Sequence, residues 1–140
     1  MVPINYWAVL VAAIVQMFLG WLWYGPLFGK SWSAMMGFTP EKMQEAQAKG
    51  MGKSYTIMTV GALLMSWILA HAIVFASTYL MFYGALAGIT VGFLNWLGFI
   101  APVTLSSVLW EGKSWKFWFL NAGYYLVGLC LMGAILAAWQ

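Results

Sequence analysis

The sequence predicts an all-α membrane protein, a bundle of four transmembrane helices with a short cytoplasmic helix between the first and the second. Of its 140 residues, 64% are hydrophobic and 6% are charged. A soluble domain needs about 25% charged residues to cover its surface, so most of this surface must face lipid. Four apolar stretches are each long enough for the roughly 20 residues of a bilayer crossing. Together they form a single polytopic domain over residues 1–140.

The four spans are expected at about residues 6–24, 55–76, 83–109 and 117–139. Backbone N–H and C=O groups have no water partners in hydrocarbon, so each span must satisfy them internally as a helix. None of the four stretches shows the alternation of polar and apolar residues that marks a barrel strand.

The lysines predict the orientation of the spans. By the positive-inside rule, the loops that contain them face the cytoplasm, and both termini then lie outside. The net charge of +3 is therefore a topology signal and not a nucleic-acid surface. Four lysines lie between the first two spans and two between the last two: Lys30, Lys42, Lys49 and Lys53, then Lys113 and Lys116.

The first lysine-bearing loop contains the signals of a helix over residues 40–49. Thr39 is a suitable N-cap, Pro40 suits the first helical position and Glu41 lies in the first turn. Lys49 in the last turn and Gly50 after it favour termination there. This helix should lie at the membrane surface.

Two stretches suggest an internal repeat. "FLGWLWYGP" at Phe18–Pro26 resembles "FLNWLGFIAP" at Phe93–Pro102, and Gly-Lys-Ser-Trp follows each. A duplicated two-helix unit would produce this pattern, as in transporters with parallel repeats; the alternative is chance matching between tryptophan-rich helices. Because proline cannot donate to the carbonyl four residues earlier, a kink is expected near Pro102.

The three Gly-Lys-Ser tripeptides do not predict a nucleotide site. A phosphate-binding loop needs a glycine five positions before the glycine of the Gly-Lys pair. Those positions hold Tyr24, Gln47 and Ser107. The single cysteine, Cys130, also rules out a disulfide framework. No nucleotide, cofactor or metal is expected.

A few polar side chains fall at membrane depth, where such groups mark functional sites or hold helices together. His71 is the one candidate for a proton- or substrate-linked site, and the alternative is a neutral histidine that bonds to a neighbouring helix. For the other three, Gln16, Asn95 and Asn121, interhelical hydrogen bonding is the default role. The deeper indoles should also need partners inside the bundle: Trp21, Trp67 and Trp96.

Gly84, Gly88 and Gly92 form a stripe of small residues on the third span. Such a stripe lets a second helix approach closely. It would either close the bundle or form an oligomer interface, and packing within the chain is favoured.

No arrangement of nucleophile, acid, base or metal ligands is recognisable, which disfavours an enzyme and leaves two other classes. The first is a small transport, channel or permeability component with a path lined by Gln16, His71, Asn95 and Asn121. The second is a structural or accessory protein that packs against a larger membrane partner. The expected partners are the lipid bilayer and either a homo-oligomer or a membrane partner protein.

Several short motifs occur in a characteristic order: "GWLWYGPLFGKSW", "WLGF" at Trp96–Phe99, "WEGK" at Trp110–Lys113, "NAGY" at Asn121–Tyr124 and "MGAILAAW" at Met132–Trp139. In this order and spacing they resemble a bacterial membrane family known as domain-of-unknown-function family 1761. The resemblance covers about residues 5–139. It implies a small four-helix protein of the bacterial inner membrane, and it implies no activity, substrate or catalytic residue.

Overall fold

The computed structural model describes all residues from Met1 to Gln140. Helices account for 83% of the residues and there is no strand, which confirms the all-α class. Four helical segments are long and apolar enough to cross a membrane, in agreement with the predicted bundle. They cover Tyr6–Leu27, Gly52–Leu80, Ala85–Leu109 and Trp115–Ala138. The second segment extends beyond the predicted 55–76 at both ends, since the helix continues into the flanking loops.

The first and third segments are not uniform α-helices. The first consists of α1 (Tyr6–Leu22) and the π-helix η1 (Trp23–Leu27). The third consists of α5 (Ala85–Asn95), the π-helix η2 (Trp96–Ile100), α6 (Ala101–Thr104) and α7 (Ser106–Leu109). The other two segments are single helices, α4 (Gly52–Leu80) and α8 (Trp115–Ala138).

One π-helix contains a proline, and the other ends two residues before one. The N–H of Phe28 donates to the Trp23 carbonyl at 2.9 Å, five residues earlier, and Pro26 lies inside this turn. In η2 the N–H of Ala101 donates to the Trp96 carbonyl, directly before Pro102. A proline removes one ordinary helical bond, and a wider π turn accommodates the change of register. The irregularity expected at Pro102 is therefore a π-helix that precedes the proline.

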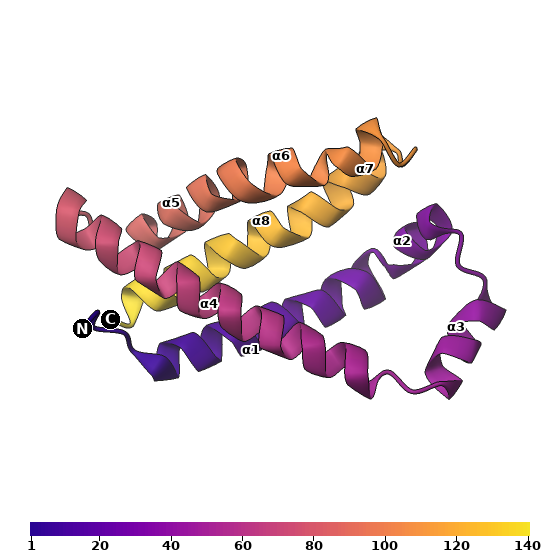
Figure 1. The fold of residues 1–140 in the computed structure, drawn as a ribbon, viewed down its shortest axis with the longest axis horizontal. Coiled ribbons are helices and arrows are strands. Elements are labelled where there is room, and N and C mark those ends of the chain that lie inside the picture. The colour runs from indigo at the N-terminus through magenta and orange to yellow at the C-terminus, as the bar shows by residue number, and fades with distance from the viewer.

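The loop between the first two segments contains α2 (Gly29–Met36) and α3 (Pro40–Ala48). The Thr39 hydroxyl oxygen accepts from the Lys42 backbone N–H at 3.2 Å, as an N-cap does. All residues of α3 are exposed, and the helix extends away from the bundle in Figure 1.

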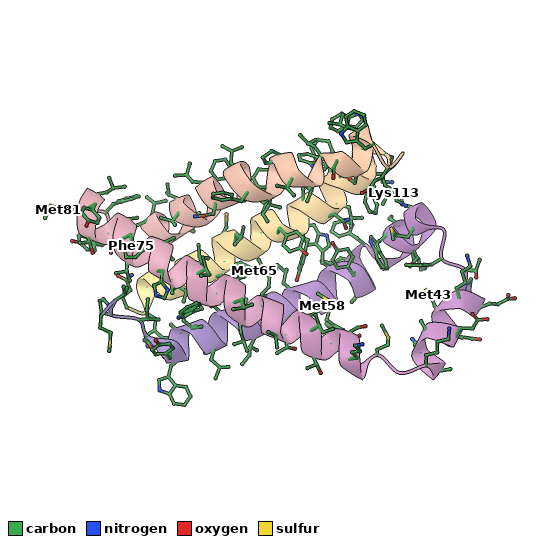
Figure 2. The ribbon with its side chains drawn as sticks, viewed as in Figure 1. Met43, Met58, Met65, Phe75, Met81 and Lys113 are labelled. Atoms are coloured by element: carbon green, nitrogen blue, oxygen red, sulfur yellow. The ribbon has the colours of Figure 1, made fainter.

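Both termini lie at the same end of the bundle (Figure 1), where the Asn5 side-chain amide donates to the Trp139 carbonyl at 2.9 Å. The turn between α4 and α5 lies at this end too, whereas Lys113 and α3 lie at the other (Figure 2). This arrangement suits four consecutive crossings. Which end faces the cytoplasm stays a prediction from the lysines.

Helix α8 lies at the centre of the bundle, against α1, α4 and α5. The main apolar core is formed by α1, α4 and α8. Its members include many alanines, so the helices lie close together with little side-chain bulk between them. They are Ala8, Val9, Ala12, Leu69, Ala70, Ile73, Leu129, Met132, Leu136 and Ala137.

Close backbone approach joins α5 to α8. A Cβ atom added to Gly88 would collide with the Gly133 carbonyl, and one added to Gly92 would collide with the Leu129 carbonyl. Gly84 differs from the other two members of the stripe. It precedes α5 with φ +86°, and nothing lies within 4 Å of an added Cβ. Gly88 and Gly92 therefore pack within the chain, and Gly84 serves the turn.

We predict that Gly88→Ala lowers the free energy of unfolding by about 1–3 kcal/mol, because the added methyl group forces the α5 and α8 backbones apart. Gly61→Ala is the matched control, since an added Cβ there meets nothing within 4 Å. Thermal unfolding of both variants in the same detergent gives the comparison. Equal midpoints for the two would contradict the close packing described here.

Candidate functional site

The structure separates the four predicted polar positions into different places. Gln16 and Asn121 both lie between α1–η1 and α8, in what we call the polar cluster: Gln16, Tyr24, Asn121 and Tyr124. Asn95 lies beside a groove between α4 and η2, and His71 lies on α4. The expected single path lined by all four is therefore not formed within one chain.

Two tyrosine hydroxyls hold the polar cluster together. The Tyr24 hydroxyl donates to the Asn121 side-chain oxygen at 2.8 Å, and the Tyr124 hydroxyl donates to the Gln16 backbone carbonyl at 3.2 Å. The two rings meet edge to face with 5.2 Å between centroids. Gly20 makes room for this contact, because a Cβ there would lie 2.9 Å from the Tyr124 hydroxyl oxygen. The cluster thus forms a hydrogen-bonded seam between α1 and α8.

Gln16 has an unusual environment for a polar side chain. It is 3% exposed, and its Oε1 atom has no hydrogen-bond partner. The amide lies against Gly128, where any side chain would occupy the same space. A buried amide oxygen without a partner costs about 1–3 kcal/mol, so Gln16 lies here at a cost in stability.

Two indoles join the π-helices to the backbone of α8. Trp23 Nε1 donates to the Leu120 carbonyl at 3.0 Å, and Trp96 Nε1 donates to the Ala122 carbonyl at 2.7 Å. Trp23 and Trp96 are each the first residue of a π segment. The suggested repeat instead paired Trp21 with Trp96. Trp21 is 63% exposed and makes no side-chain hydrogen bond, so the expectation of an internal partner was wrong for it.

The expectation of interhelical bonding was wrong for Asn95 and His71, and the Gln16 side-chain oxygen makes no such bond either. Asn95 Nδ2 donates to the Val91 carbonyl at 2.8 Å, one turn earlier in its own helix. His71 Nδ1 bonds to the Trp67 carbonyl at 2.8 Å in the same way. A carbonyl one turn back is always within reach of a short polar side chain on a helix, so it competes with partners on other helices.

His71 and Trp67 each leave a hydrogen-bonding group without a partner in the chain. A carbonyl can only accept, so Nδ1 of neutral His71 carries the proton and Nε2 is left as an acceptor. The His71 and Trp67 rings meet edge to face at 4.8 Å. Trp67 is 41% exposed, and its indole N–H has no partner within the chain. Since Trp67 lies near the middle of α4, a donor and an acceptor remain unpaired at membrane depth.

An apolar groove lies between α4 and η2, with a volume of about 400 Å³. Asn95 is the one polar residue among those that line it. Met65 belongs to this lining, on the part of α4 that crosses α8 in Figure 2. The apolar members are Leu64, Met65, Ile68, Leu69, Phe99, Ile100 and Leu129. Sequence reasoning placed Asn95 at membrane depth but gave no sign of this groove, which depends on the splay between helices.

The model of the family described as "Protein of unknown function (DUF1761)" matches residues 7–137. The chain belongs to this family. The match covers all four membrane-capable segments, so the DUF1761 region and the helical bundle are the same unit. Searches of curated proteins and of solved structures gave no match. The DUF1761 assignment supports the architecture and brings no activity with it.

We predict that Tyr24 and Asn121 are energetically coupled. Removing the hydroxyl in Tyr24→Phe leaves Asn121 without its donor, and a double-mutant cycle with Asn121→Leu should give a coupling of about 0.5–1.5 kcal/mol. Tyr55→Phe is the control, because the Tyr55 hydroxyl makes no hydrogen bond in the chain and the residue is exposed. Unfolding by denaturing detergent gives the free energies. Strictly additive effects would show that the observed bond contributes nothing.

Proposed function

We propose that this protein is a small transport or permeability component that acts as an assembly of several copies, with the path between subunits. It would reside in the bacterial inner membrane with both termini outside the cytoplasm. The first support for a path between subunits is the close packing of the helices inside one chain. Gly88 and Gly92 contact the α8 backbone, and alanines fill much of the contact between α1, α4 and α8. A single four-helix bundle packed in this way has no room for a polar path.

The observation on which the proposal depends is the pair formed by the exposed Trp67 and the half-buried His71 on α4. A free indole N–H and a free imidazole acceptor are costly in hydrocarbon, where no water can satisfy them. Lys53, Thr56 and Thr78 share this side of α4, because they repeat at helical spacing with Trp67 and His71. We call these five residues the α4 face. A second α4 face could supply donors and acceptors to the first, as an isologous contact does.

A second candidate function is that of an accessory protein for a larger membrane partner. The exposed helix α3 favours it, since α3 is capped and regular but extends away from the bundle (Figure 1). Met43 in α3 accepts from the Ser33 hydroxyl at 3.8 Å, a weak contact with α2. A helix with so little support within its own chain suits contact with another protein. In this case the α4 face would meet the partner and not a second copy.

We predict that Val60→Cys forms disulfide-linked dimers in membranes, in a chain where Cys130 has been replaced by alanine. Val60 is 51% exposed and lies between Thr56 and Trp67 on the same side of α4, so two copies would bring their thiols together. Phe119→Cys is the control, because Phe119 is 65% exposed at the same end of the bundle but on α8. Equal cross-linking of both variants would indicate random collision and would argue against the α4 face.

We predict that vesicles containing the protein pass protons, potassium or glycerol faster than empty vesicles, and that His71→Leu reduces this flux at least threefold. The reduction follows because leucine removes the one imidazole from the shared face. Thr90→Val serves as control, since Thr90 is half-buried on α5 and its hydroxyl bonds to the Leu86 carbonyl of its own helix. Dyes inside the vesicles report each solute. Absent flux together with retained dimers would reject transport and favour the accessory function.

A further inference from the structure

We propose that the groove between α4 and η2 binds a neutral, long-chain lipid that carries one hydroxyl group, with the hydroxyl donating to the Asn95 side-chain oxygen. This inference needs no second copy of the chain, because the groove and Asn95 belong to a single chain. It rests on the volume of the groove, its apolar lining and the one unpaired acceptor within it.

The groove has the size and composition of a small-molecule site. Its volume of about 400 Å³ lies within the range of roughly 300–1,000 Å³ that is usual for ligand sites. Residues from four helical elements form it: Leu64 and Ile68 from α4, Asn95 from α5, Phe99 from η2 and Leu129 from α8. The α4 residues Leu64 and Ile68 are 54% and 58% exposed, so the groove opens toward lipid. An apolar chain can therefore enter from the bilayer without crossing water.

Asn95 gives the groove a single polar contact. Its Nδ2 donates to the Val91 carbonyl at 2.8 Å, which fixes the orientation of the amide. Its Oδ1 atom accepts no hydrogen bond from the chain and still has two lone pairs. Acyl chains of ordinary lipids fill such a groove but leave this oxygen unpaired. A ligand that donates one hydrogen bond removes that cost.

The depth of Asn95 decides the chemical class of the ligand. Asn95 is close to the middle of the segment Ala85–Leu109, and so close to the centre of the bilayer. Charged headgroups are held at the membrane surface, because a charge at the bilayer centre costs several kcal/mol. The donor must therefore be uncharged and attached to a molecule that is otherwise apolar. A long-chain or isoprenoid alcohol meets both conditions, whereas a phospholipid does not.

The π-helix η2 explains why the groove forms beside Asn95. Trp96, the next residue, is held on the α8 side by its bond to the Ala122 carbonyl. Phe99 and Ile100 then follow through a widened turn and line the groove with Asn95. The same bond that fixes η2 to α8 thus keeps the groove wall in place.

The test uses two photoreactive probes, a long-chain alcohol with a diazirine on its chain and the methyl ether of the same molecule. Both partition into vesicles that contain the full protein, and only the alcohol can donate a hydrogen bond. We expect the alcohol to label groove residues about five- to tenfold more than the ether, the ratio for one net hydrogen bond. Asn95→Leu should lower alcohol labelling to the level of the ether.

Two further variants make the outcome decisive. Thr90→Val removes a polar group from α5 outside the groove and should leave labelling unchanged. Leu64→Trp fills the open side of the groove at an exposed position and should reduce labelling by both probes. Equal labelling by alcohol and ether, unchanged alcohol labelling in Asn95→Leu, or labelled peptides outside the groove would each overturn the proposal. Melting curves of the variants verify that all of them are folded.

Discussion

The close approach of α5 to α8 is the contact on which the rest of the bundle depends. Gly88 faces Gly133 and Gly92 faces Leu129 with no room for a Cβ atom. This contact brings Trp96 within reach of the Ala122 carbonyl, and Trp23 reaches Leu120 from the other side of α8. Helix α8 is thus held by both irregular segments. Because other helices already cover much of α8, one side of α4 has no contact with the rest of the chain.

The sequence predicted the architecture because composition and length alone decide it in a bilayer. Four apolar stretches must be helices, and glycines four residues apart permit close packing, as Gly88 and Gly92 show. The partners of polar side chains could not be predicted in the same way. The bond from Tyr24 to Asn121 depends on how two distant helices are rotated. Asn95 and His71 had an alternative in their own helices, and they use it.

The tryptophans show the same limit. The shared Phe-Leu-x-Trp-Leu pattern paired Trp21 with Trp96, but Trp23 is the residue that donates to α8 as Trp96 does. The π-helices begin at Trp23 and Trp96, which are not equivalent positions of that pattern, so a comparison by sequence position alone misses the match. Whether the two halves arose by duplication stays a prediction. What the halves share in the structure is a π-helix that begins with a tryptophan bonded to α8.

The account separates a sealed interior, with the unpaired Gln16 side-chain oxygen, from the α4 face that includes the half-buried His71. Reaction with a water-soluble, membrane-impermeant thiosulfonate distinguishes them, using Gln16→Cys and His71→Cys in the variant Cys130→Ala. The account predicts that Cys at position 71 reacts, because water between subunits carries the reagent and allows the thiol to ionise. Cys at position 16 should not react, because it is sealed from water. Reaction at 16 without reaction at 71 would place water inside the bundle and contradict the account.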